Sequence, residues 1–280
     1  MRLVRFGEKG SEKPGVIDET GIIRDVSSIV PDYGPETLSP NLVEQLAQAD
    51  LAALPAAPAG IRLGAPVARI GHYIAIGLNY ADHAAETGAA IPSEPIVFSK
   101  APNCLSGPND DVLMPRGSQK LDWEVELAIV IGSRCDYVDQ REALDHVLGY
   151  ALANDVSERE YQAERGGQWI KGKSAPTFGP LGPWIATRDE IADPQALRMF
   201  LNVNGEPRQK GSTATMIFSV AHIVSYLSRF MVLDPGDVIV TGTPPGVALG
   251  MKPPVYLKAG DEMHLGVEGL GEQRQKVVAR

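Results

Sequence analysis

The sequence contains very little cysteine. Among its 280 residues, only Cys104 and Cys135 are cysteines, and they form no C-x-x-C pair. A disulfide framework or a zinc knuckle needs several cysteines at close and regular spacing, so neither is indicated here. We expect two ordinary thiols in a reducing compartment.

Long apolar runs and clusters of positive charge are also missing. No stretch has the length of a membrane span, and residues 1–8 lack the apolar segment of a secretion signal. The formal net charge is -9, and no run of Lys and Arg offers a phosphate-binding face. A G-x-G-x-x-G fingerprint is absent, and we expect no nucleotide to bind. These absences predict a cytoplasmic protein that binds neither membranes nor nucleic acids, with small molecules or other subunits as its partners.

Turn-forming residues, in contrast, are abundant. The chain has 29 Gly and 22 Pro, and 44% of its residues are hydrophobic, a composition typical of globular proteins with many short strands. Strand patterns near the start, a helical pattern at 41–53 and an Ala/Pro-rich stretch at 54–60 predict a small β-rich N-terminal domain with a linker, residues 1–65. Residues 66–280 are predicted to form an α+β, β-rich main domain. Its helices are expected near 142–148, 157–165 and 215–230.

Two glutamates, Glu124 and Glu126, stand at the start of the apolar run that continues to Ile131. In a strand, residues two apart point to the same face, so these carboxylates project together. Burying such a pair is costly unless a cation or a shared proton compensates it, which favours a metal ion over a solvated edge strand. Asp155 ends the next apolar run, where it could cap a helix or supply a third ligand. Three carboxylates and water suit Mg²⁺ or Mn²⁺.

A candidate general base lies upstream of these carboxylates. His83 and Glu86 are three residues apart in a predicted helical turn, so the carboxylate could orient the imidazole, although a surface ion pair is the alternative. Downstream, two loops dense in Gly and Pro, at 168–180 and 237–247, fit a site where backbone approaches an anionic ligand. Lys173 would provide a fixed positive charge there, but turn formation alone also accounts for such loops.

The order of these motifs resembles the fumarylacetoacetate hydrolase family. The match runs from about Ile74 to the C-terminus. It rests on an ordered set of motifs: Gly77-Leu78-Asn79-Tyr80 with His83 and Glu86, Phe98-Ser99-Lys100, Glu124-x-Glu126, Asn154-Asp155, Lys173-Ser174, Pro235-Gly236-Asp237 and Thr241-Gly242-Thr243-Pro244. The resemblance implies a mixed β-roll of twisted sheets, a small variable N-terminal domain and assembly as a homodimer.

The resemblance also implies roles for individual residues. The metal ligands would be Glu124, Glu126 and Asp155, with Mg²⁺ as the cofactor and Mn²⁺ as a substitute. The catalytic residues would be His83, Glu86 and Lys173. The substrate contacts would fall on Arg159, Gln162, Thr243 and, through looser matches, Lys100 and Thr177.

The close spacing of the His–Glu pair resembles the short, acylpyruvase-like branch of the family. This implies a metal-dependent hydrolase that cleaves a C–C bond in a 2,4-diketo acid, giving pyruvate and a second acid. The N-terminal set Arg5-Phe6-Gly7-x-Lys9-Gly10 with Lys13-Pro14-Gly15 is similar to bacterial members that act on 2,4-diketo-3-deoxy sugar acids from rhamnonate or fuconate breakdown. Oxaloacetate decarboxylation and ureidoglycolate cleavage at the same metal site are the alternatives.

Overall fold

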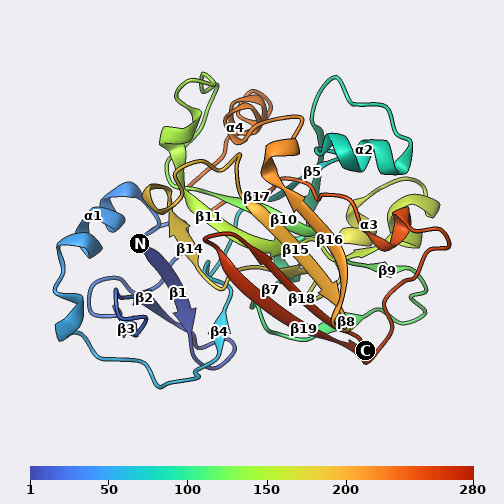
Figure 1. Ribbon diagram of the computed structural model, residues 1–280. Coiled ribbons are helices and arrows are strands. Elements are labelled where there is room, and N and C mark those ends of the chain that lie inside the picture. The colour runs from blue at the N-terminus through green and yellow to red at the C-terminus, as the bar shows by residue number, and fades with distance from the viewer.

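A long, twisted sheet runs through the molecule (Figure 1). The computed structural model describes residues 1–280, apart from the side chain of Thr87. The sheet has ten strands in the order β3-β2-β1-β14-β11-β10-β17-β5-β6, with β4 paired to β1. The strands are β1 Arg2–Phe6, β2 Lys13–Ile17, β3 Ile23–Asp25, β4 Leu63–Gly64, β5 Tyr73–Gly77, β6 Ile96–Lys100, β10 Val125–Ile131, β11 Val147–Asn154, β14 Ile185–Thr187 and β17 Val238–Val240.

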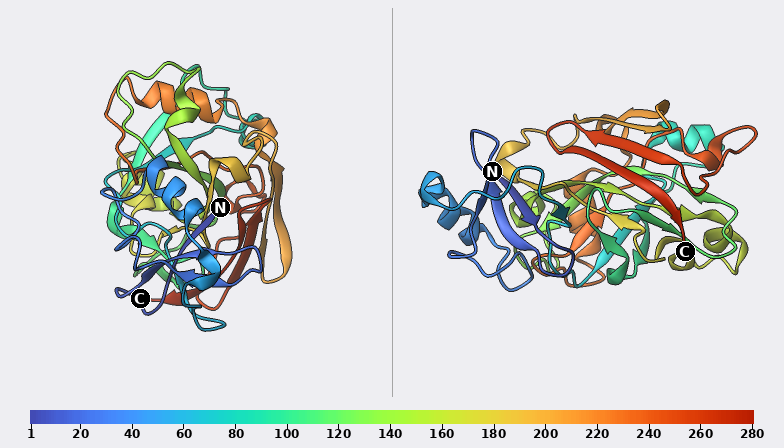
Figure 2. Two further views of the ribbon diagram at one scale, coloured as in Figure 1. Left: turned by 90° about the vertical axis from the view of Figure 1, so that its left-hand side faces the viewer. Right: turned by 90° about the horizontal axis from the view of Figure 1, so that it is seen from below.

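A five-stranded sheet packs on the long sheet, and its strands cross β10 and β11 (Figures 1 and 2). Its order is β16-β15-β18-β19-β8, with β8 pairing parallel to β19. The strands are β8 Val112–Met114, β15 Arg198–Val203, β16 Glu206–Ser212, β18 Glu262–Val267 and β19 Gly271–Ala279. Two short ladders complete the strands, β9 Leu121–Asp122 with β12 Ser157–Glu158 and β7 Leu105–Ser106 with β13 Gly179–Pro180.

Strands β10 and β11 lie at the centre of the fold, and every residue of both strands is buried. They are covered on both faces, so their sequences are almost continuously apolar instead of alternating. They pair antiparallel, with Val125 opposite Asn154. This register brings Glu124, which precedes β10, and Glu126, its second residue, next to the end of β11, where Asp155 follows.

Helices are short and lie outside the sheets: α1 Pro40–Gln48, α2 Ala81–Thr87, α3 Ile170–Lys173 and α4 Val220–Leu227. Single 3₁₀ turns occur at 51–53, 102–104, 143–146, 188–190, 213–215 and 248–250, and a π-helical turn at 160–164. None of the helices in the described part of the chain has the length and apolarity needed to cross a membrane.

Two of the predicted helices are partly wrong. At 142–148 the structure has one 3₁₀ turn, and Val147 and Leu148 already belong to β11, because the buried sheet pairing outweighs the helical pattern. At 157–165 the chain first pairs with β9 and becomes helical only at Glu160. The predicted helices at 41–53 and 215–230 are confirmed in shorter form, each capped by a serine, Ser39 and Ser219.

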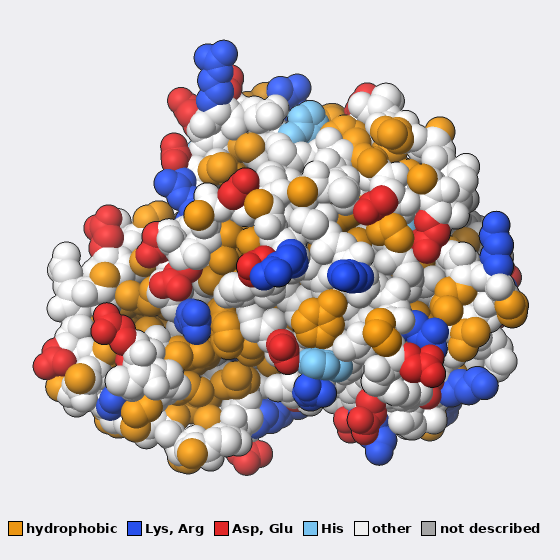
Figure 3. Space-filling model, viewed as in Figure 1, with side chains coloured by type: hydrophobic (Ala, Val, Ile, Leu, Met, Phe, Trp, Pro, Cys, Tyr) orange, Lys and Arg blue, Asp and Glu red, His pale blue; other side chains and the backbone are white. Residues whose placement is uncertain are grey.

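The predicted β-rich, mixed-sheet fold is confirmed. The N-terminal strands do not form a sheet of their own, since Arg2 and Leu3 of β1 pair with β14 and continue the long sheet. The division of the chain near residue 65 therefore stays a prediction. Both cysteines are buried and unpaired, as expected. On the face shown in Figure 3, Lys and Arg side chains are scattered among Asp and Glu.

Candidate active site

Three carboxylates meet where β10 begins and β11 ends. Glu124, Glu126 and Asp155 each place one oxygen within 4.8 Å of the others, and all three side chains are buried. Burial, together with the neighbouring charges of Asp155 and Glu124, raises the pKa of Glu126 well above its usual range. The cluster therefore has the oxygen donors and the proximity that a divalent cation such as Mg²⁺ or Mn²⁺ requires, and such a cation would relieve the like-charge repulsion at Glu126.

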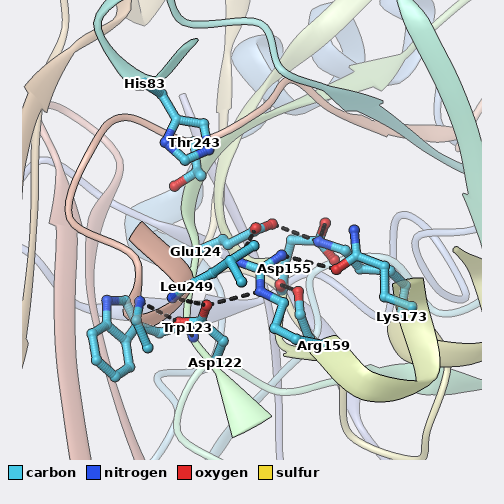
Figure 4. Close-up of polar contacts among 12 residues, drawn as sticks. His83, Asp122, Trp123, Glu124, Asp155, Arg159, Lys173, Thr243 and Leu249 are labelled. Carbon is cyan, nitrogen blue, oxygen red and sulfur yellow. Dashed lines mark hydrogen bonds and ion pairs between the residues drawn. The ribbon is translucent and has the colours of Figure 1, made fainter. Parts of the chain in front are cut away.

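Two cations of the chain also face this cluster (Figure 4). Lys173 Nζ donates to Glu124 Oε2 and Asp155 Oδ2, each at 2.6 Å. Arg159 donates to Glu124 Oε1 at 2.6 Å and, through Nε, to Asp122 Oδ2 at 2.8 Å. Burial by itself would raise the pKa of Glu124, but Arg159 and Lys173 outweigh it and lower that pKa to about 2. Glu124 is thus held as an anion in the folded chain.

Asp155 is not a helix cap. Its Oδ1 accepts a hydrogen bond from Lys100, and its Oδ2 accepts one from Lys173. Lys100 is almost fully buried and donates a second bond to the backbone oxygen of Lys173 at 2.6 Å. Lys100 therefore connects the end of β6 with Asp155 and with the end of α3.

A cavity of about 290 Å³ opens over the carboxylates. Most of the predicted site residues line it: His83, Glu124, Glu126, Asp155, Arg159, Gln162, Lys173 and Thr243. Among the described residues, Glu86, Lys100 and Thr177 do not belong to its lining. Thr177 instead accepts a hydrogen bond from Leu113 N at 2.8 Å, and Lys100 lies behind Asp155.

The predicted His–Glu pair is formed within α2. His83 Nδ1 lies 3.2 Å from Glu86 Oε2, so the carboxylate fixes the orientation of a ring that borders the cavity. Glu86 also accepts from Gly246 N, at 3.1 Å to Oε1. This contact ties α2 to the loop after β17, which carries Thr243.

Comparison with known proteins agrees with this architecture. Residues 72–278 match the model of the fumarylacetoacetate (FAA) hydrolase C-terminal domain. The chain belongs to the fumarylacetoacetate hydrolase family. A protein named only as a hydrolase, from Burkholderia multivorans, is 56% identical over 276 residues, 98% of each chain.

Two solved structures are similar over the full chain. The fumarylacetoacetate hydrolase of psychrophilic Exiguobacterium antarcticum is 40% identical, with a TM-score of 0.88 and full coverage of both chains. The maleylpyruvate hydrolase of Sphingobium sp. SYK-6, in complex with a manganese(II) ion and pyruvate, is 30% identical. It has a TM-score of 0.83, with 100% of this chain and 99% of that chain covered. This chain is thus an enzyme of a family whose members act on acylpyruvate-like substrates, and its buried acidic triad fits a divalent metal.

Three buried polar residues support this family site, and the sequence had indicated no role for any of them. Gln209 on β16 donates to Thr243 Oγ1 and to Pro244 O, both at 2.8 Å, and accepts from Val125 N at 3.0 Å. Asn154 accepts from Glu124 N at 3.1 Å, and Asp122 binds Arg159 and the backbone of the 248–249 turn. Asn154 belongs to the recognised Asn154-Asp155 motif and Asp122 lies two residues before Glu124, but Gln209 lies on a strand with no such signal.

A phosphate-binding spacing also occurs beside the site. Gly167, Gly172, Lys173 and Ser174 follow the Gly-x4-Gly-Lys-Ser pattern, so it was wrong to expect no nucleotide on the ground that such a spacing is missing. A phosphate-binding loop follows a strand and places its lysine on the phosphates. Here the segment follows a π-helical turn, and Lys173 is engaged by two carboxylates of this hydrolase-family site. The structure therefore gives no support to nucleotide binding.

Proposed function

We propose that this enzyme is a metal-dependent hydrolase that cleaves the C3–C4 bond of a 2,4-diketo acid, R–CO–CH₂–CO–COO⁻, to pyruvate and R–COOH. The observation that carries the proposal is that the acidic triad and the ring of His83, oriented by Glu86, border one cavity. The structure of a relative, maleylpyruvate hydrolase, contains manganese(II) and pyruvate, which supports pyruvate as one product here.

Glu124, Glu126 and Asp155 would hold the metal ion, with Mg²⁺ the proposed ion and Mn²⁺ its substitute. Their fit rests on the oxygen donors within 4.8 Å of one another and on the raised pKa of Glu126. When bound, such an ion supplies a Lewis acid for the oxygens of the 2-oxo acid. Lys100 would act through Asp155, whose position it fixes, without touching the substrate.

His83 is assigned as the general base. With Nδ1 directed at Glu86, its Nε2 removes a proton from water, and the negative charge of Glu86 stabilises the imidazolium that forms. The hydroxide oxygen bonds to the C4 carbonyl carbon. The C3–C4 bond then breaks, its electron pair goes to C3, and C3 takes the proton from His83 to become the methyl group of pyruvate. The overall reaction consumes one water and needs no oxidant or reductant.

The cationic and polar residues around the triad orient the substrate. Lys173 holds a positive charge where negative charge develops on the C2 oxygen as the C3–C4 bond breaks. Arg159, Gln162 and Thr243 border the same cavity. We assign the N–H groups of Arg159 and Gln162 to the substrate carboxylate. Thr243 is assigned to the wall that the substrate contacts, because its hydroxyl already donates to Val125 O at 2.9 Å.

The identity of R is a separate question. The N-terminal residues that resemble sugar-acid hydrolases do not, in the part of the chain described, line the cavity, and Arg5 is paired with Asp32. A diketo-deoxy sugar acid is therefore one candidate among the 2,4-diketo acids.

A substrate panel tests the proposal. Purified enzyme with Mg²⁺ is mixed with acetylpyruvate, a 2,4-diketo-3-deoxy sugar acid or oxaloacetate, and pyruvate is measured, while ureidoglycolate is followed by its own product assay. We expect pyruvate from the 2,4-diketo acids, with release abolished by a chelator and restored by Mg²⁺ or Mn²⁺. Turnover of oxaloacetate or ureidoglycolate alone would contradict the proposal.

Assembly and location complete the proposal. We infer a cytoplasmic homodimer that binds a small 2-keto acid and neither nucleic acid nor membrane. Light scattering on the purified chain, with twice the monomer mass of 30.0 kDa as the expected result, tests the dimer.

A further inference from the structure

The cavity lining divides into a polar and an apolar part. Several polar residues gather around the triad, where Arg159 and Lys173 both bind Glu124 and Gln162 accepts from Arg159 at 3.0 Å. His83, Thr243 and Glu164 also border the cavity, and the Glu164 carboxylate accepts from Lys120. The remaining lining is dominated by apolar side chains, namely Ile76, Leu78, Ala89, Phe98, Ala163, Trp169 and Leu249. A ligand held at the triad by its oxo acid therefore extends along hydrocarbon and aromatic surface.

Part of this apolar wall is fixed by close packing. The rings of Phe98 and Trp169 meet edge to face with centroids 5.1 Å apart, and Lys173 Nζ lies 5.3 Å from the centre of the Phe98 ring. Gly77 lies beneath the indole, since a Cβ there would come within 2.6 Å of Trp169 Cζ3. The aromatic pair is thus held next to the polar end of the cavity.

Two leucines also belong to the apolar part of the lining. Leu78 adopts a left-handed backbone conformation with φ of 52°, which is uncommon for a residue that has a Cβ. Leu249, in the turn after the Thr243 loop, is 49% exposed. Large apolar side chains that stay partly exposed at the edge of a cavity favour apolar ligand groups, because hydroxyl groups lose water there without gaining hydrogen bonds.

We propose that the acyl substituent R of the substrate is apolar, so that this enzyme prefers simple acylpyruvates to hydroxylated sugar-acid analogues. The inference rests on the proposed hydrolase function and specifies its substrate class. A cavity of about 290 Å³ lies at the small end of the range for ligand sites, which fits a short alkyl chain or one ring.

A matched pair of substrates tests the preference. Propanoylpyruvate (2,4-dioxohexanoate) and 5-hydroxy-2,4-dioxohexanoate, a 2,4-diketo-3-deoxy sugar acid, differ by one hydroxyl group. We expect kcat/KM, from pyruvate release, to be roughly 10- to 100-fold higher for the compound without the hydroxyl, the range for an added hydroxyl in an apolar pocket. Leu249→Asn should reduce this ratio several-fold, and Leu249→Ala serves as a second variant if the first fails to fold.

The control variant is Val255→Asn. Val255 is also 49% exposed but, among the described residues, is not part of the cavity lining, so the ratio should stay at its wild-type value. Equal kcat/KM for the two substrates, or preference for the hydroxylated one, would overturn this inference and leave the hydrolase function standing. Absence of pyruvate release from every 2,4-diketo acid, acetylpyruvate included, would overturn both.

Discussion

His83 is the residue whose assigned role separates hydrolysis from other reactions of a 2-keto acid. Hydrolysis needs an activated water, whereas decarboxylation of oxaloacetate does not. His83→Ala should therefore reduce acylpyruvate hydrolysis by about 10²- to 10⁴-fold, the usual contribution of a general base, and reduce any oxaloacetate decarboxylation far less. Pyruvate release from each substrate measures the two activities, and the difference between their losses tests the role of His83.

Two further variants serve as controls for His83. Glu86→Gln should also reduce hydrolysis more than decarboxylation, but by less than His83→Ala does. The imidazole ring stays in place but loses the negative charge that supports its protonated form. His222→Ala, on α4 and outside the cavity lining given by the described residues, should change neither activity. Equal loss of both activities in His83→Ala, with metal affinity intact, would assign His83 to substrate positioning.

Gln209 is a positioning residue that holds the Thr243 loop against β10, the strand that begins beside the proposed metal ligands. Gln209→Met removes three hydrogen bonds and leaves buried partners on Val125, Thr243 and Pro244 unsatisfied. We expect the free energy of unfolding in urea to fall by about 1–3 kcal/mol and kcat to fall more than KM changes. Lys210→Met, one residue further on the exposed side of β16, should alter neither quantity. Wild-type stability and kcat in Gln209→Met would reject this role.

Much of the site at this scale could be predicted from the sequence. Glu124 with Glu126 and His83 with Glu86 follow from residue types at fixed local spacing. Asp155 and Lys173 had other interpretations, a helix cap and a turn, and only the resemblance to the family assigned them to the site. Lys100 could be named but not placed, because its contact with Asp155 depends on how β6 packs beside β11's end. Gln209 could not be found, since a glutamine on an otherwise polar strand carries no local sign of burial.

At the scale of elements, the N-terminal strands are attached to the rest of the molecule by an ionic cluster as well as by β1–β14 pairing. Arg62 donates two hydrogen bonds to Asp110, at 2.9 and 2.7 Å, and one to Glu12 at 2.9 Å. Burial acts to raise the pKa of Asp110, but the bonds from Arg62 and from Gly107 N outweigh it and hold that pKa below its usual value. Asp110 is therefore bound most strongly as an anion.

The stabilising effect of Asp110 should depend on pH. A lowered folded-state pKa stabilises the fold above the unfolded value of about 3.9, and this contribution is lost as the pH falls through the folded-state pKa. Asp110→Asn should thus lower the free energy of unfolding by about 1–2 kcal/mol at pH 7, and the difference from wild type should shrink below pH 4. Denaturant titrations at several pH values measure this, with the exposed neighbour Asp111→Asn as the control. A difference that is constant from pH 7 to pH 3 would contradict it.

The positions of the central strands could be predicted from the sequence more accurately than those of the short helices. Runs such as 124–131 and 238–241 are apolar, β-branched and bounded by turns, so local pattern and tertiary packing agree. Residues 147–148 and 157–158 also fit a helix, and only pairing with distant strands decides their conformation. The pairing of β1 with β14 joins residues far apart in the sequence, such as Arg2 and Ala186, and no local pattern encodes such a contact.

For the whole molecule, the metal should govern activity more than folding. Lys100, Lys173 and Arg159 already bind the carboxylates within the chain, so removal of metal by a chelator should abolish hydrolysis while the circular dichroism spectrum is retained. Saturating Mg²⁺ should raise the melting temperature by several degrees, since a ligand at 100 times its Kd contributes about 2.7 kcal/mol. Mg²⁺ with oxalate should raise it further than either alone.

The matched control for the metal is Glu126→Gln, whose amide oxygen keeps the contact with Gly242 N that Glu126 makes at 2.7 Å. This variant should fold, show no Mg²⁺-dependent shift and lack activity. Full activity after exhaustive metal removal, or a normal Mg²⁺ shift in Glu126→Gln, would reject the ligand assignment.

The parallel pairing of β5 with β17 bears on the order in which the molecule assembles. It joins distant parts of the chain, as the bond from His72 N to Asp237 across 165 residues illustrates, whereas β10 and β11 form an antiparallel pair of neighbouring strands. Closing the longer loop costs more chain entropy and is slower. During synthesis, the strand pair that carries the three carboxylates can form before β17 has left the ribosome. The wall that contains Thr243 and supports Glu86 lies after β17 in the chain. Synthesis therefore delivers the three carboxylates proposed to hold a metal before the residues that close the cavity for substrate.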